Sequence, residues 1–320
     1  MYLKNDSLQG VLFGLGATLL WGSYPLWYKP LAELDAYQLL SWRVVFAEIF
    51  LILLILLTGR LSTLRSTLKT VYPVHVLTIS AVLGLWWLMY IYGIIHGRVL
   101  EVAFGYFLSP IMSMSVSLLL FKERLTAWQT SAILLAIVGV TLMGFELLSL
   151  HSFPWIALII GFCYCFYGIF KKKVSGDPVV VQALEVAVLL PFAIFFLIWS
   201  VSLGLGHTFL ISQSQDVLLI ATGLITALPL WWYSLAAKQL SVVALGFLQF
   251  IPPICNFLLA VFVYNETTSH TKLAAFFFIW LALGLFTWNA IQAQRGSNSD
   301  GLAPVGSGSK RLIKLEGCHE

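Results

Sequence analysis

The sequence predicts an all-α integral membrane protein in which ten transmembrane helices form two five-helix repeats of inverted topology. Three observations lead to this prediction: the composition, ten apolar runs of bilayer length, and a motif that occurs twice. With 60% hydrophobic and 10% charged residues, a chain of 320 residues has too little polar surface to cover a soluble particle. The composition therefore argues against a soluble enzyme.

The apolar runs define the predicted helices in order. A bilayer core needs about 20 apolar residues per helix, and runs of that size cover residues 8–28, 36–58, 72–95, 99–121, 127–146, 153–171, 179–204, 215–237, 240–264 and 272–292. The first run lacks a small-x-small cleavage site, which favours an uncleaved span over a signal peptide. Residues 296–320 are rich in Gly, Ser and Lys, and we expect a disordered cytoplasmic tail there.

The positive charges are distributed unevenly across these spans. Of the 18 Lys and Arg residues, fourteen fall on the side of the N-terminus, whereas Lys29, Arg98 and Lys272 fall on the other side and Arg43 lies within a span. The positive-inside rule then places both termini in the cytoplasm. This distribution also explains the net charge of +4 without nucleic acid, because the basic residues gather on no single face.

The repeated motif divides the chain. The motif Leu100–Pro110, LEVAFGYFLSP, is repeated 141 residues later as the similar segment Ser241–Pro252, SVVALGFLQFIP. Because each copy holds five spans, an odd number, the second copy crosses the membrane in the opposite sense. We therefore expect a first repeat over residues 1–148 and a second, inverted repeat over 149–295. Inverted repeats are typical of alternating-access transporters that hold the substrate near the midplane.

Several further motifs follow one another in a recognisable order. They are WGSYPLWYK at 21–29, WR at 42–43, KER at 122–124, FYGIFKKK at 166–173, TALPL at 226–230 and LGFLQFIPP at 245–253. Together with LEVAFGYFLSP, this series resembles the RarD branch of the EamA family, in the drug/metabolite transporter superfamily. The resemblance covers about residues 8–292 and implies a ten-helix permease of the bacterial inner (plasma) membrane. Trp86 stands where the family pattern has an asparagine, which favours a more apolar or aromatic ligand if that position faces the substrate.

Charged residues inside the spans are candidates for the transport pathway, because charge at membrane depth is costly unless it is paired or hydrated. Arg43 is the strongest candidate and Glu48 a weaker one; a structural ion pair or snorkelling is the alternative. Glu185 lies beside the counterpart of Arg43 in the second repeat. It could carry a proton as the coupling ion, or serve as a fixed partner of Arg43.

Other polar and kinked positions complete the first group of candidates. Glu101 opens its helix, where an acid is stabilised by the helix N-terminus; the functional alternative is a gate near the external mouth. Pro110 and Pro252 free backbone carbonyls for a neighbour, water or ligand. Gln249 and Asn256, seven residues apart, are predicted to share a helix face and to bind a polar ligand group or clamp two helices.

Aromatic residues form the second group. Many tryptophans gather at membrane interfaces, but Trp21, Trp87, Trp231 and Trp232 fall on predicted helices 1, 3 and 8, which the resemblance places in the core of each repeat. They could stack on an aromatic or cationic solute. Tyr106, within the repeated motif, is also a candidate.

The predicted function is a secondary-active transporter of a small organic metabolite or drug-like solute that works by alternating access. The alternatives are a structural or sensory membrane subunit and, more weakly, an intramembrane enzyme. The sequence has no HExxH, GxSxG or metal-spaced Cys/His motif, so neither a cofactor nor a metal is expected. The expected partners are the solute and membrane lipid, with the protein as a monomer or a homodimer.

Overall fold

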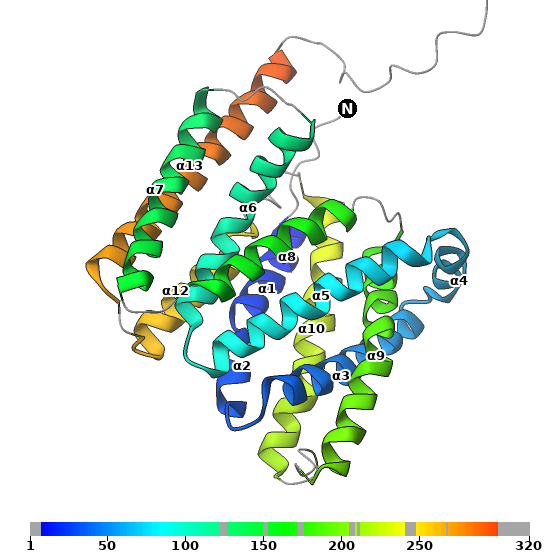
Figure 1. Cartoon of the computed structure of the whole chain (residues 1–320). Coiled ribbons are helices and arrows are strands. Elements are labelled where there is room, and N and C mark those ends of the chain that lie inside the picture. The colour runs from blue at the N-terminus through cyan, green and yellow to red at the C-terminus, as the bar shows by residue number, and fades with distance from the viewer. Residues whose placement is uncertain are drawn as a thin grey trace, which may run out of the picture.

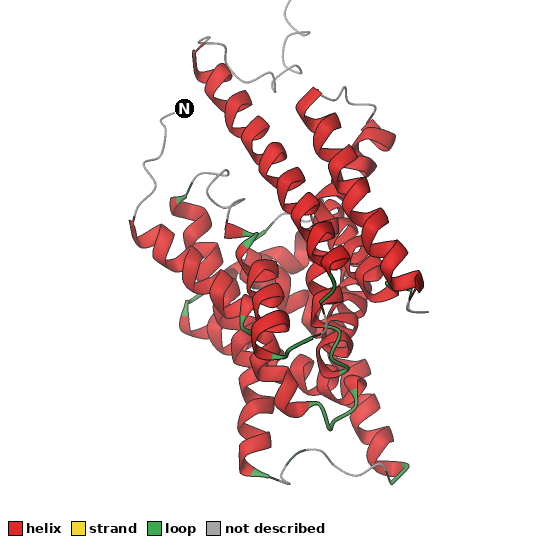
Figure 2. Ribbon diagram, turned by 90° about the vertical axis from the view of Figure 1, so that its left-hand side faces the viewer, coloured by secondary structure: helices red, strands yellow, loops and turns green. Residues whose placement is uncertain are grey.

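The computed structural model describes residues 8–121, 127–149, 153–171, 176–204, 209, 212–240, 248–266 and 268–299. The regular structure in these residues is entirely helical (Figure 2). Four of the helices are long and apolar enough to cross a membrane, namely Ala36–Leu57, Pro73–Ile95, Pro178–Ser202 and Gln213–Gln239. Shorter apolar helices occupy the other predicted ranges. The all-α prediction therefore holds for the part of the chain that the structure describes.

The helices follow the predicted order closely (Figure 1). Their bounds are α1 Leu8–Gly22, α2 Tyr24–Tyr28, the 3₁₀ helix η1 Lys29–Leu31, α3 Ala36–Leu57, α4 Leu61–Thr70, α5 Pro73–Ile95, α6 Val99–Phe121, α7 Ala127–Ser149, α8 Trp155–Lys171, α9 Pro178–Ser202, α10 Gln213–Gln239, α12 Ile251–Leu258, the π-helix η2 Leu259–Val263 and α13 His270–Ser299.

The first predicted span, 8–28, is not one continuous helix. It ends as α1 at Gly22 and resumes as α2 after Ser23, with Pro25 in the first turn of α2. Proline has no N–H and its ring clashes with the preceding turn, so it is favoured in the first turn of a helix and disfavoured in an interior. The break places Tyr24 and Tyr28 on a short separate helix.

The ninth predicted span, 240–264, also differs from the prediction. Gln249 lies in a turn, and α12 begins at Ile251 with Pro252 in its first turn. Gln249 and Asn256 therefore do not share a face of one regular helix, and Pro252 starts a helix instead of kinking one. The same chemistry of proline explains both corrections. Residues 241–247 of the repeated segment lie outside the described residues.

Helix α4 was not predicted. Its leucines recur at positions 61, 64 and 68 between Ser, Thr, Arg and Lys residues, so it is amphipathic and too short to span a bilayer. It contacts the beginning of α9. Nearby, the Arg60 guanidinium donates to the Asp177 carboxylate at 2.7 Å, and the same carboxylate oxygen caps α9 by accepting from the Val179 amide. This contact links the two halves of the chain at one end of the bundle.

Close helix contacts depend on glycine, as small residues allow in membrane bundles. A Cβ on Gly105 in α6 would lie 2.8 Å from the Ala157 carbonyl oxygen in α8, and one on Gly139 in α7 would lie 2.8 Å from the Ala275 carbonyl oxygen in α13. In Figure 1, α7 and α13 run side by side along one flank, while α1, α6 and α8 cross the middle of the bundle.

Candidate functional site

Arg43 lies deep in the bundle, one-third of the way along α3, with 2% of its surface exposed. Three aromatic rings surround its guanidinium carbon: Trp87 at 4.0 Å, Tyr24 at 5.1 Å and Tyr28 at 5.7 Å from their centroids. We call these four residues the Arg43 cage. The rings come from α2 and α5, so three separate elements build it. The predicted pathway residues Arg43 and Trp87 are thus in contact.

The rings of the cage leave hydrogen-bond donors of the Arg43 guanidinium without acceptors. The Arg43 Nε and Nη1 atoms are buried and have no hydrogen-bond partner, and Arg43 belongs to neither of the ion pairs among the described residues. A buried ion without a partner costs several kcal/mol, whereas a desolvated cation–π contact contributes about 2 kcal/mol. Arg43 and Glu185 do not form the ion pair that was one of the two alternatives for Glu185.

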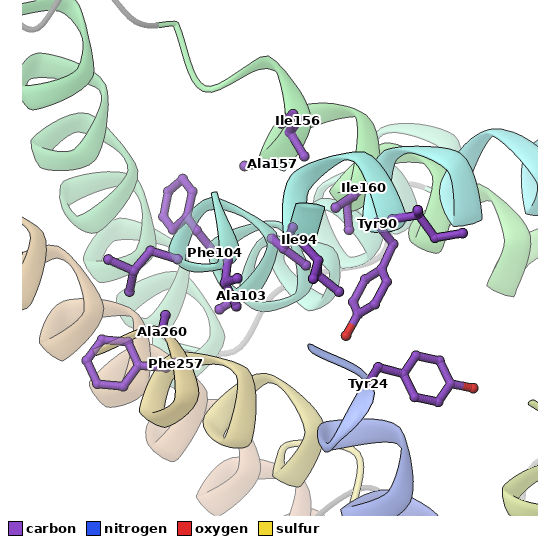
Figure 3. Packing of buried hydrophobic residues seen from close by; sticks show 14 of the residues in the cluster. Tyr24, Tyr90, Ile94, Ala103, Phe104, Ile156, Ala157, Ile160, Phe257 and Ala260 are labelled. Carbon is purple, nitrogen blue, oxygen red and sulfur yellow. The ribbon is translucent and has the colours of Figure 1, made fainter. Parts of the chain in front are cut away.

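An aromatic cluster continues from the cage toward α6 and α8. The Tyr24 ring contacts Tyr90, which contacts Tyr106; Figure 3 shows Tyr24 and Tyr90 next to one another in the core. Trp86 of α5 contacts Tyr106, and its indole N–H donates to the Tyr106 hydroxyl at 3.1 Å. The same indole packs edge-on against Tyr164 of α8 at 5.0 Å. Tyr106 and Trp86 therefore belong to one continuous aromatic surface.

Two side-chain amides border this cluster. The Tyr164 hydroxyl donates to the Gln249 carbonyl oxygen at 2.7 Å, and the Gln249 amide nitrogen donates to the Tyr233 hydroxyl at 2.7 Å. The buried Asn256 accepts from the Tyr90 hydroxyl at 3.4 Å. Both amides therefore link helices, which fits the clamp alternative, and both also reach tyrosines of the central cluster.

Glu185 is fully buried in α9. Its carboxylate accepts from the Tyr167 hydroxyl of α8 at 2.8 Å, and the same hydroxyl lies 3.2 Å from the Gln182 carbonyl oxygen. The Tyr167 ring contacts Trp86, so this carboxylate adjoins the aromatic cluster through one tyrosine.

Two carboxylates cap helices at the end of the bundle opposite Arg60. Glu101 does not stabilise only its own helix α6, as the sequence suggests; it accepts from the Ile156 amide at 2.9 Å, at the start of α8, and forms an ion pair with Arg98. Glu266 accepts from the Val99 and Leu100 amides of α6 at 2.6 and 2.8 Å. Each carboxylate thus joins one half of the chain to the other.

Lys29 and Lys272 carry positive charge toward Glu266 at this end. Burial raises the pKa of the Glu266 carboxyl, and the two α6 amides and both lysines act against that rise. Lys29 also donates to the Ile94 carbonyl oxygen at 3.3 Å.

Replacing Glu266 with alanine should lower the stability of the protein. The amides of Val99 and Leu100 would lose their acceptor, and a buried donor without a partner costs about 1–3 kcal/mol. Thermal unfolding of the purified protein in detergent measures the change. Glu33→Ala, which removes an exposed acid in the segment just before α3, is the matched control. Equal melting temperatures for the two variants would contradict the capping role.

The other predicted site residues lie around the same centre. Trp21 contacts the Tyr233 ring at 5.4 Å, and the Trp232 ring lies against Gly16 of α1. Pro252 packs close to Gly22, where α12 meets α1. Trp231 is half-buried in α10. Pro110 falls within α6, but its side chain lies outside the described residues.

The sequence reasoning left out most of the tyrosines. Tyr24, Tyr28, Tyr90, Tyr164, Tyr167 and Tyr233 all contact predicted site residues, yet none was chosen. A usable signal was their position: a phenol in the middle of an apolar span must find a hydrogen-bond partner in the bundle. Within the described residues, no group of three His, Cys, Asp or Glu side chains could hold a metal ion.

Comparison with known proteins identifies the family. Residues 8–145 match the EamA-like transporter family. The protein RarD of Escherichia coli (strain K12) is 34% identical over 292 residues, covering 91% of this chain and 98% of RarD. The chain belongs to the EamA family, as a RarD-type member. The EamA membership and the apolar helices together indicate a multi-pass bacterial membrane protein.

Other EamA relatives extend this result. A protein described as an uncharacterized transporter from Vibrio cholerae is 33% identical, covering 91% of this chain and 95% of its own. The chloramphenicol-sensitive protein RarD of Pseudomonas aeruginosa is 29% identical and covers 90% and 98%. One crystal structure aligns with a TM-score of 0.55 at 18% identity, over 86% of this chain and 96% of its own. This last likeness concerns the fold alone.

Proposed function

We propose that this EamA protein is a secondary transporter of a small organic solute that works by alternating access between two inverted five-helix repeats. The observation that carries the proposal is the pairing of helix contacts. The ten proposed spans are α1 with α2, α3, α5, α6, α7, α8, α9, α10, α12 with η2, and α13. In an inverted repeat, the counterpart of each span lies five spans later. If two spans are in contact, their two counterparts should also be in contact.

The observed contacts obey this exchange. Helix α1 packs against α10 and α12, and its counterpart α8 packs against α5 and α6. Likewise α3 contacts α10, and its counterpart α9 contacts α5. Three spans also contact their own counterparts, namely α3 with α9, α6 with α12 and α7 with α13. This regularity supports two repeats that can rock against one another.

Equivalent caps and glycines add to the support. Asp35 caps α3 by accepting from the Tyr37 amide at 2.8 Å, and Asp177 caps its counterpart α9. A Cβ on Gly84 in α5 would touch Leu189 of α9, and one on Gly223 in the counterpart α10 would touch Phe46 of α3. Such matched details are expected of a duplicated unit.

The central residues suit a solute site between the repeats. The Arg43 cage, the aromatic cluster and Asn256 come from α2, α3, α5, α6, α8 and α12, which belong to both halves. Gln249 lies in the turn before α12 and contacts Tyr164 of α8 and Tyr233 of α10. Sites of this kind combine apolar and aromatic surface with a few polar groups that fix orientation. The Asp177–Arg60 pair and the Glu101 and Glu266 caps join the halves at opposite ends, where alternating access requires contacts that open in turn.

We further propose that both termini lie in the cytoplasm of the inner membrane, that the protein works as a monomer or a homodimer, and that a proton carried by Glu185 drives transport. The orientation rests on the fourteen Lys and Arg residues on the side of the termini. Lys29 and Lys272 both act on Glu266, which agrees with their shared assignment to the opposite side. Buried carboxylates in membrane spans are the usual proton carriers of transporters. The hydroxyl of Tyr167 gives this carboxylate a partner that can accommodate a change of protonation.

The test is transport in proteoliposomes that contain the purified full chain. Uptake and efflux of a panel of labelled metabolites are measured with and without a pH gradient, and empty liposomes give the background. We expect at least one organic solute to cross at more than ten times that rate. A folded protein that moves no solute under either condition would leave the structural or sensory role in its place.

A further inference from the structure

We propose that Arg43 binds the carboxylate of the transported solute, which is a small organic monoanion with an apolar or aromatic body. This inference rests on the proposed transport function and names its substrate class. The Arg43 cage carries the argument, because it brings a buried cation and unused hydrogen-bond donors together against aromatic rings.

The first step concerns the donors. Arg43 Nε and Nη1 and the Tyr28 hydroxyl are all buried, and all lack a hydrogen-bond partner. A guanidinium is permanently charged and only donates, so the group that satisfies it must be an acceptor, and an anion satisfies it best. Arg43 therefore selects an anion and repels a cation. The Tyr28 hydroxyl adds a second donor beside the same guanidinium.

The second step is that no acid within the described part of the chain pairs with Arg43. Glu48 lies five residues further along α3, about 140° around the helix from Arg43, and its own Oε2 atom is buried without a partner. Glu185 accepts from Tyr167 and forms no ion pair with Arg43. The acids Glu101 and Glu266 are held by backbone amides at the end of the bundle.

The third step concerns the charge and shape of the solute. Arg43 is the single Lys or Arg away from the ends of the predicted spans, since Lys171 and Lys272 stand at span ends. The site therefore neutralises one negative charge and leaves a dianion uncompensated. Next to the cage, the rings of Tyr24, Tyr90 and Tyr106 form an apolar surface for the remainder of the solute. Arg43 is only 2% exposed, so the rings must part for the solute to enter, as a change of access would allow.

The experiment uses three probes of one shape: phenylacetate, phenylacetamide and phenethylamine, which are anionic, neutral and cationic. Each is tested as a labelled solute in proteoliposomes and as a ligand that shifts the melting temperature of the detergent-purified full chain. Phenyl phosphate serves as a dianionic fourth probe. For the wild-type protein we expect phenylacetate to be favoured at least tenfold over the other three.

The variants are Arg43→Gln, Arg43→Lys and Tyr28→Phe, with Arg65→Gln on the exposed face of α4 as the matched control for loss of an arginine. We expect Arg43→Gln to remove the preference for phenylacetate over phenylacetamide, and Tyr28→Phe to weaken it several-fold. Arg43→Lys keeps the charge but not the planar set of donors, and should retain part of the preference. Arg65→Gln should behave as wild type.

The outcomes separate this inference from the proposed function. If phenylacetamide or phenethylamine is transported as well as phenylacetate, or if Arg43→Lys and Arg43→Gln leave the preference unchanged, the inference is wrong while transport stands. If phenylacetate raises the melting temperature through Arg43 but no solute crosses the membrane, the anion site stands and the transport function is wrong. If Arg43→Gln fails to fold, the wild-type probe series and Tyr28→Phe still decide the matter. If no probe binds or crosses, the inference is also wrong.

Discussion

Gly223→Ala is expected to lower the melting temperature of the purified protein more than alanine at any other helical glycine that the structure describes. In α10, a Cβ at this position would lie 2.5 Å from the Phe46 Cβ and 2.6 Å from the Phe46 carbonyl oxygen of α3. Real Cβ atoms do not approach other atoms this closely, so the two helices must separate. Overpacking of this kind costs about 1–3 kcal/mol and occasionally more.

The reason for the large effect is that the obstacle is backbone. A flexible side-chain tip can rotate away, but the Phe46 main chain is held in the middle of α3 by its own helical hydrogen bonds. The contact between α3 and α10 also joins the two proposed repeats. Moving these helices apart would therefore disturb the Arg43 cage, three residues before Phe46 on α3, and we expect transport to fall together with stability.

Gly144→Ala in α7 is the matched control. It adds the same methyl group to a helical glycine, but nothing lies within 4 Å of the new Cβ. Because alanine favours helix over glycine, this variant should be neutral or slightly stabilising. Thermal unfolding in the same detergent compares the two. A Gly223→Ala protein as stable as Gly144→Ala would show that α3 and α10 do not pack as closely as described.

The positions of the helices could be predicted because a span needs an apolar run of fixed length. The prediction of 99–121 matches α6, and that of 36–58 matches α3 within one residue. The break at Gly22 was not predicted because Pro25 lies inside an unbroken apolar run, and the length of such a run does not show where a proline interrupts the helix. Helix α4 was missed because its alternation of leucine with polar residues lowers the mean hydropathy.

The charged residues of the candidate site could be predicted from the sequence, but the side chains that they contact could not. Arg43 and Glu185 stand out because charge is rare in a membrane span. Their partners depend on how each helix is rotated about its axis, which the sequence pattern does not specify. Arg43, for example, contacts Trp87, 44 residues further along the chain. An Arg43–Glu185 pair was one of two alternatives that the sequence left open, whereas tyrosines of α2 and α8 contact these two residues instead.

Glu185→Gln should abolish the dependence of transport on a pH gradient, if Glu185 carries the coupling proton as proposed. The substitution keeps the size of the side chain and an oxygen that can accept from the Tyr167 hydroxyl. In the wild-type protein that hydroxyl lies 2.8 Å from the Glu185 carboxylate. It removes only the ability to gain and lose a proton. We therefore expect a folded variant in which uptake driven by the gradient falls at least tenfold.

Exchange separates this effect from general damage. Counterflow of labelled against unlabelled solute moves no net protons, so a protein that has lost only its proton carrier should keep it. Glu48→Gln is the matched control, since it neutralises another buried acid within a span, in α3. Loss of counterflow as well as uptake in Glu185→Gln would instead assign Glu185 to solute binding or packing. Unchanged dependence on the pH gradient would remove Glu185 as the carrier, and the coupling would then reside in another group or in the charge of the solute itself.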